Sequence, residues 1–158
     1  MERLTIKGLV AGLALWGLSC AGSASQLRAP TVALRAEVRL CKAVDVRLGP
    51  SGVLGTDPVE VGEAFYASDW QALAWVSLGA LSKSHRVRWV WYDPSGERYL
   101  DSGEVTANPT GRPKRHNQMW HALRVWGERA ARRPGRWNVT IYLDGEPLVS
   151  RDFTLRVR

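Results

Sequence analysis

The chain has 158 residues, a formal net charge of +7 at pH 7 and two cysteines. Its length suits one compact domain that buries a core of its own. Removal of an N-terminal leader would leave Cys41 as the only cysteine. That excludes an intradomain disulfide and predicts a buried, inert thiol.

Residues 1–25 have the layout of a secretory signal peptide. Arg3 and Lys7 precede an uncharged apolar run, and small residues follow it. The run, residues 8–18, is too short for the ~20 residues of a membrane-spanning helix. Two cleavage sites stay open: the small residues 23–25, or a lipoprotein leader ending at Cys20, whose lipid would anchor the chain. We therefore expect an exported chain with a mature domain over residues 26–158.

The first expected strand covers residues 32–41. Val38 and Leu40 fall on one face, and Arg35, Glu37 and Arg39 on the other, a period of two that is typical of a half-buried strand. Residues 48–62 are rich in glycine and proline. They predict an irregular connection with at most a short edge pairing near Val59. Residues 70–78 are apolar enough for a central strand.

The stretch RVRWVWYDPSGERYL, residues 86–100, predicts two strands joined by a tight turn. Val87, Trp89 and Trp91 project to one side, with Arg86 and Arg88 on the other. Residues 93–96, DPSG, suit a type I turn. The side shared by the two tryptophans is therefore expected to face the core.

A polar segment at residues 101–118 is expected to be a long loop, which in compact domains is usually functional or mobile. Residues 119–126, MWHALRVW, fit both helical and strand spacing. We favour a strand, followed by one helical turn through residues 127–133. Residues 136–157 predict a β-hairpin, because Trp137, Val139 and Ile141 alternate before the turn-forming pair Asp144 and Gly145.

These elements predict an all-β fold: an antiparallel β-sandwich of about seven strands. The motifs VRWVWYDPSGERY, WHALRV and RRPGRWNVTIYLDGEPLVSRDFTL resemble immunoglobulin-like β-sandwich domains of secreted or lipid-anchored bacterial proteins of unknown function. The resemblance covers about residues 36–157. It implies an immunoglobulin-like fold and no catalytic residue.

Two surfaces are candidates for binding. The first is basic and would attract an anionic envelope component, a lipid, glycan or protein; it comprises Arg112, Lys114, Arg115, Arg129, Arg132, Arg133 and Arg136. The alternative is carbohydrate recognition by Trp70, Trp120 and Trp126, which lie beside polar or basic residues. Packing in the core or at its rim competes with that role.

No catalytic, metal-binding or nucleotide-binding motif is present in the sequence. His85, His116 and His121 lack the spacing of metal ligands. A hydrolase would need one of them to meet a serine, cysteine or carboxylate in a cleft. We expect a non-catalytic binding or structural module of the cell envelope, without a cofactor or metal. Export argues against nucleic acid as the partner of these arginines.

Overall fold

The computed structural model describes residues 36–50, 52–109 and 117–157. These ranges contain eleven strands, where about seven were expected, and one short 3-10 helix, η1. The elements are β1 (Ala36–Cys41), β2 (Ala43–Gly49), β3 (Gly52–Val59), β4 (Ala64–Tyr66), β5 (Gln71–Leu78), β6 (His85–Tyr92), β7 (Arg98–Asp101), β8 (Val105–Ala107), β9 (Asn117–Arg124), η1 (Arg129–Arg132), β10 (Gly135–Leu143) and β11 (Glu146–Arg156).

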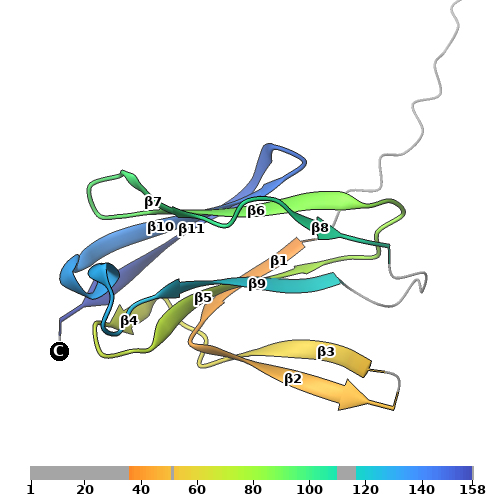
Figure 1. Ribbon diagram of the computed structural model, residues 1–158, viewed down its shortest axis with the longest axis horizontal. Coiled ribbons are helices and arrows are strands. Elements are labelled where there is room, and N and C mark those ends of the chain that lie inside the picture. The colour runs from red at the N-terminus through yellow and green to blue at the C-terminus, as the bar shows by residue number, and fades with distance from the viewer. Residues whose placement is uncertain (1–35, 51, 110–116, 158) are drawn as a thin grey trace, which may run out of the picture. The chain divides into compact units, whose positions relative to one another are not determined.

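The strands form two layers with a hairpin beneath them (Figure 1). One layer is a six-stranded sheet in the order β4-β11-β10-β6-β7, with β8 pairing to the other end of β6. The second is the three-stranded sheet β1-β5-β9, and β2 with β3 forms the hairpin. Among the described strands, β4 and β11 pair in parallel. The expectation of an entirely antiparallel arrangement is wrong at this pair.

The core lies between the two layers and contains the predicted tryptophans. Trp89, Trp91 and Trp137 are at most 1% exposed. They face the small inner side chains of β5, such as Ala74 and Val76, which are also buried. Each indole removes roughly 150–250 Å² from water, so these three rings supply much of the hydrophobic stabilisation. The prediction that they fill the core is confirmed.

His121 brings a polar ring into this core from β9. Its Nδ1 accepts a hydrogen bond from Nε1 of Trp91 at 3.0 Å. Its ring stacks near Trp89, with a centroid distance of 6.1 Å. Burial lowers the pKa of His121 below its ordinary value of 6.5, an effect that the charge of Asp101 partly opposes. A neutral imidazole therefore suits this position.

Both predicted turns are confirmed. Gly96 donates its backbone N–H to the carbonyl of Asp93 at 2.9 Å, which closes the turn between β6 and β7. Asp144 and Gly145 have φ values of 52° and 88°. This left-handed conformation at both positions is what a two-residue hairpin turn requires, and it joins β10 to β11. The helical turn expected near residues 127–133 is present as η1.

Residues 48–62 are not the irregular connection that their composition predicts. They supply β3, which pairs with β2 along its length. Pro58 is tolerated because this two-stranded sheet has an open edge, where a missing N–H costs no ladder hydrogen bond. The hairpin is held to the sheet above it by Gln118, whose Oε1 accepts the backbone N–H of Thr56 at 2.5 Å.

The hairpin covers a second, smaller core on the outer face of the three-stranded sheet. Cys41, Leu73 and Trp75 form this cluster, with Val44 packed against it. The indole Nε1 of Trp75 donates to Oγ1 of Thr56 at 3.0 Å. Cys41 is fully buried and unpaired, as expected of the lone thiol.

Residues 101–118 are only partly a loop. Val105–Ala107 form β8, and β9 already begins at Asn117. The strand expected over residues 119–126 is confirmed, and it starts two residues earlier and ends at Arg124. The predicted signal peptide, with Cys20, lies outside the described residues. Within the described ranges, no helix is long and apolar enough to cross a membrane.

Candidate functional site

Trp70 and Trp126 form a surface pair at one end of the three-stranded sheet. The carbonyl of Trp70 accepts the N–H of Val125 at 3.1 Å, and the carbonyl of Asp69 accepts the N–H of Trp126 at 3.0 Å. These bonds bring the two indoles to a centroid distance of 5.6 Å, tilted by 37°. Trp70 is 56% exposed and Trp126 is 60% exposed. Both rings therefore present much of their area to solvent.

Arg124 completes this pair. Its guanidinium carbon lies 4.9 Å from the centroid of the Trp70 ring, a cation–π geometry. Arg124 is exposed, and none of the ion pairs among the described residues involves it. Its charge is thus available to a ligand that contacts the indoles.

Asp69 fixes the loop that carries Trp70. Its carboxylate accepts the backbone N–H of Tyr66 at 2.8 Å and the ammonium of Lys42 at 3.1 Å. The hydrogen bond to Asp69 raises the pKa of Lys42 above its ordinary range. The loop is therefore held from both the strand before it and the end of β1, which keeps Trp70 in one place.

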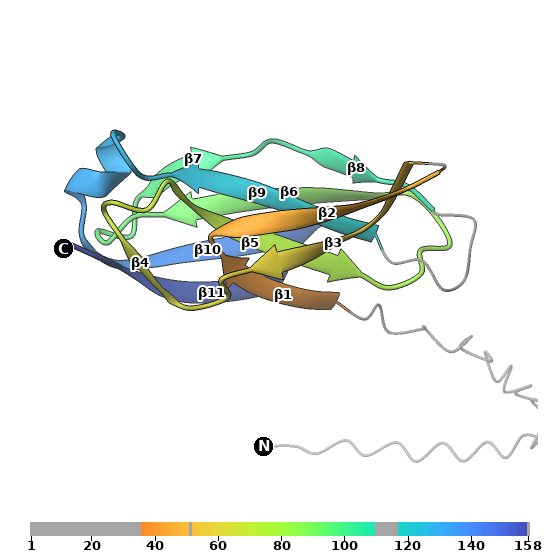
Figure 2. The ribbon, with the colours of Figure 1, turned by 90° about the horizontal axis from the view of Figure 1, so that it is seen from below.

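Trp120 lies further along β9 on the same outer face as Arg124, because the two are separated by an even number of strand residues. It is 42% exposed. At ~3.4 Å per residue the two positions are roughly 13 Å apart. We call Trp70, Trp120, Arg124 and Trp126 the Trp surface. Figure 2 shows β9 running beside the hairpin on this side of the molecule.

The structure describes four of the seven predicted basic residues. Arg112, Lys114 and Arg115 lie outside the described residues. Arg129 and Arg132 are exposed on η1, and the described part of the chain provides no ion pair to either. An anionic partner for these residues stays a prediction.

Arg133 and Arg136 have partners within the fold. Arg133 binds Asp93, a nearly buried carboxylate. Its guanidinium lies 5.5 Å from the centroid of the Tyr99 ring. Its carbonyl accepts Nε1 of the core residue Trp137 at 2.8 Å. Arg136 pairs with Asp152 on the neighbouring strand. We conclude that Arg133 stabilises the fold at this corner.

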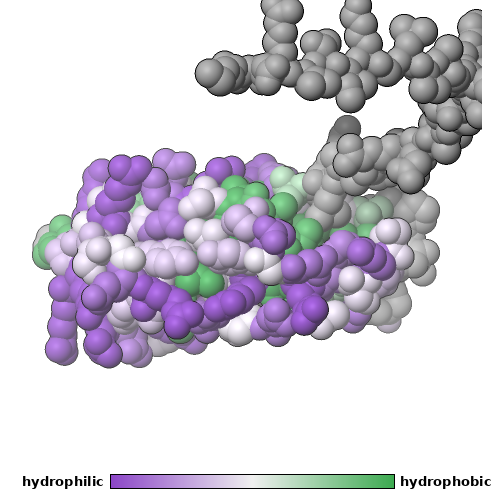
Figure 3. Space-filling view, turned by 90° about the horizontal axis from the view of Figure 1, so that it is seen from above, coloured by the Kyte–Doolittle hydropathy of each residue, from purple (hydrophilic) through white to green (hydrophobic). Residues whose placement is uncertain are grey.

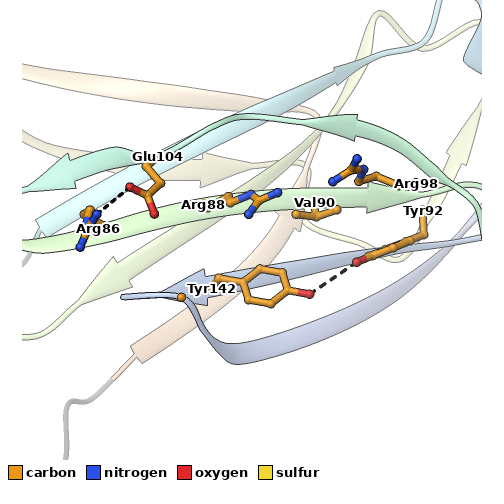
Figure 4. A pocket seen from close by; sticks show the side chains of 8 residues that line it. Arg86, Arg88, Val90, Tyr92, Arg98, Glu104 and Tyr142 are labelled. Carbon is orange, nitrogen blue, oxygen red and sulfur yellow. Dashed lines mark hydrogen bonds and ion pairs between the residues drawn. The ribbon is translucent and has the colours of Figure 1, made fainter.

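The structure also shows a small hollow that was not predicted, on the outer face of the six-stranded sheet. It encloses about 210 Å³. We call it the Arg–Tyr hollow; it is lined by Arg86, Arg88, Val90, Tyr92, Arg98, Glu104, Tyr142 and Gly145 (Figure 4). Figure 3 shows that this face of the molecule is mostly hydrophilic. The alternation of Arg86, Arg88, Val90 and Tyr92 opposite the core residues was the signal that could have located it.

The ionisable groups of the hollow are held by one another. Asp101 accepts Nε of Arg88 at 2.8 Å and a second, shorter bond from its Nη2. The hydrogen bond from Arg88 lowers the pKa of Asp101 to about 2. The hydroxyls of Tyr92 and Tyr142 are 3.4 Å apart. The hydrogen bond with Tyr142 is the main cause that raises the pKa of Tyr92 above its ordinary value, and burial is the second.

The histidines are placed as follows. Nδ1 of His85 lies 2.7 Å from Oδ2 of Asp144, a carboxylate that also accepts the N–H of Arg86 at 2.8 Å. This contact ties the turn between β10 and β11 to β6. His116 lies outside the described residues. In the described ranges, no group of three or more His, Cys, Asp or Glu side chains could hold a metal ion.

No family model and no curated protein matches the chain. Solved structures do match, at low identity. The alkylpurine DNA glycosylase AlkC of Pseudomonas fluorescens, bound to DNA with an abasic site analogue, shows a TM-score of 0.44 and 13% identity, over 76% of this chain and 30% of that one. An immunoglobulin-like protein from Pseudomonas aeruginosa shows a TM-score of 0.41 and 15% identity, over 76% of this chain and 97% of that one.

The prediction that the chain is not an enzyme is contradicted by this comparison, because one of the matched structures belongs to an enzyme. The chain spans 30% of the length of that glycosylase. Glycosylase chemistry is a property of that protein and is not assigned to this chain.

Proposed function

We propose that the chain is an exported, immunoglobulin-like β-sandwich that serves as a binding module of the cell envelope and recognises carbohydrate through the Trp surface. The observation that carries this proposal is the exposed pair of Trp70 and Trp126 with Arg124 over one ring. An anchor at Cys20 would keep such a module at the membrane, and free secretion would release it.

The exposure of the pair supports a binding role. A large apolar side chain that only closes the core loses nearly all of its contact with solvent, as Trp137 does. Trp70 and Trp126 keep more than half of theirs. Adjacent exposed aromatic rings on a folded domain are typical of a surface that another molecule covers.

Indole rings and sugars are chemically complementary. One face of a pyranose ring presents C–H groups that pack against the electron-rich face of an indole. The hydroxyls at the edge of the sugar accept hydrogen bonds from a guanidinium such as that of Arg124. Trp120, roughly 13 Å from Arg124 along β9, would extend the contact to a chain of several sugars.

The test is affinity electrophoresis of the full chain through gels that contain soluble neutral polysaccharides, one per gel. We expect retardation by at least one of them. Trp126→Ala should weaken that retention about fivefold, because an aromatic contact of this kind contributes about 1 kcal/mol. Arg124→Gln should weaken it less, by about threefold.

Leu48→Ser is the matched control, since Leu48 is an exposed apolar residue at the tip of the hairpin, outside the Trp surface. It should migrate as the unmodified chain does. Equal loss in Leu48→Ser and Trp126→Ala would contradict the proposal, as would unchanged mobility of the unmodified chain in every gel.

A further inference from the structure

The Arg–Tyr hollow is separate from the Trp surface. It lies over β6, with β7 on one side and β10 on the other, on the outer face of the six-stranded sheet. Val90 forms its floor. This valine is 3% exposed although it points away from the core, because the neighbouring side chains enclose it. The site is therefore a concave feature of a sheet face that is otherwise open to solvent.

The walls of the hollow are hydrogen-bond donors. Arg88 and Arg98 come from neighbouring strands, and Arg88 uses only two of its five N–H groups on Asp101. Arg98 makes a single, longer contact with the same carboxylate, at 3.5 Å. Most of the N–H groups of these two arginines are therefore not used by Asp101.

The opposite wall is made of tyrosine hydroxyls. Figure 4 shows Tyr92 and Tyr142 pointing toward one another. Their hydroxyl oxygens are 3.4 Å apart. Only one of them can donate to the other, so one hydroxyl proton is left for a ligand. Tyr142 is also the direct cross-strand partner of Arg88. Hydroxyl and guanidinium donors therefore stand side by side at the floor.

The balance of charge defines the ligand. Three arginines, Arg86, Arg88 and Arg98, are offset by two carboxylates, those of Glu104 and Asp101. One positive charge remains. A carboxylate carries one negative charge, and its two oxygens match the fork of a guanidinium. A phosphate, with nearly two charges at neutral pH, would exceed this balance.

We propose that the Arg–Tyr hollow binds a carboxylate group, with Arg88 and Arg98 as its charged partners and a tyrosine hydroxyl as a further donor. A volume of about 210 Å³ is below the ~300 Å³ of ordinary ligand pockets. The ligand is therefore a small organic acid or the acidic sugar of a larger glycan.

The experiment is a titration of the full chain, labelled with nitrogen-15, at low salt, followed by the arginine Nε–H resonances. The probes are acetate, glucuronate, phosphate and, as the neutral control, glucose. We expect saturable shifts with glucuronate and none with glucose. A response to acetate as well would identify the free carboxylate as sufficient, and a response to glucuronate alone would identify the acidic sugar; both support the site.

Arg98→Gln should weaken the binding about tenfold, and Tyr142→Phe about threefold. Arg98 is mostly exposed, so its replacement should leave the fold intact, which circular dichroism checks. Arg47→Gln is the matched control, because Arg47 is an exposed arginine paired to a carboxylate on the hairpin. Equal weakening in Arg47→Gln and Arg98→Gln, tighter binding of phosphate than of glucuronate, or the lack of any saturable shift would overturn the proposal.

Discussion

Trp75 and Trp120 are direct partners on neighbouring strands of one sheet, yet they differ tenfold in exposure. Trp75 is 4% exposed and Trp120 is 42% exposed. The hairpin accounts for the difference. It reaches Trp75, whose indole N–H it binds through Thr56, and it leaves Trp120 uncovered. Alternation along a strand decides which face a side chain joins, and the element that covers that face decides whether it is buried.

The inner face of the same sheet behaves more simply. The six-stranded sheet covers the middle of this face, so alternation alone predicts burial there. The outer face is covered only where the hairpin lies. The Trp surface therefore occupies the part of this face that the fold leaves open, and the candidate site is the uncovered remainder of an apolar stripe.

Replacing Trp75 or Trp120 with alanine should give the largest difference in stability between two variants. Trp75→Ala should lower the free energy of unfolding by about 3 kcal/mol, because it leaves a cavity under the hairpin. Trp120→Ala should change it by less than about 0.5 kcal/mol. Urea unfolding followed by circular dichroism measures both. Similar losses in the two variants would show that the hairpin does not distinguish them.

Thr56→Val tests the hydrogen bond that holds the hairpin against Trp75. It leaves the indole N–H of Trp75 buried without its acceptor, which should cost about 1–2 kcal/mol. Cys41 reports the opening of the hairpin, because burial raises its pKa to about 11 and keeps the thiol unreactive. Labelling of Cys41 at pH 8, measured on the peptide that contains it, should be slow in the native chain and faster in Thr56→Val. Thr106→Val, at an exposed threonine of β8, should label as slowly as the native chain.

The smallest effect concerns the inner face and His121. Because burial lowers its pKa below 6.5, the unfolded chain binds a proton at this residue at a higher pH than the folded chain does. Stability should therefore fall as the pH drops from 7 to 5. His121→Gln keeps an acceptor for Trp91 and should flatten the fall. Asp101, with a pKa of about 2, adds to the loss of stability only at a pH below this range. An equal change of stability with pH in the native chain and in His121→Gln would contradict this role of His121.

Much of the fold could be predicted from the sequence, because local chemistry determined it. Trp89, Trp91 and Trp137 alternate with outward-facing residues along their strands, which predicted their burial. Asp144 and Gly145 specified the turn between β10 and β11. The hairpin was missed because four glycines and two prolines between residues 48 and 62 outweighed its weak alternation. Tertiary contacts hold the hairpin in place, namely those of Thr56 with Gln118 and Trp75.

The candidate sites could be predicted only in part. Trp70 and Trp126 were named from the sequence, but their pairing depends on the register of β5 against β9, which no local pattern specifies. The Arg–Tyr hollow was missed for the same reason. Arg88 and Tyr92 were visible on one strand, while Arg98 and Tyr142 come from two others. The predicted role of Arg133 and Arg136 in binding overlooked Asp93 and Asp152, which hold them within the fold.

The parallel pairing of β4 with β11 has a consequence for the order of assembly. β4 is synthesised before the other five strands of the large sheet, and its partner β11 is the last of those five. The large sheet therefore cannot close its edge at β4 before β11 has been synthesised. Contacts between such distant segments are slow to form. The edge at β4 should mature only after β11 has left the ribosome.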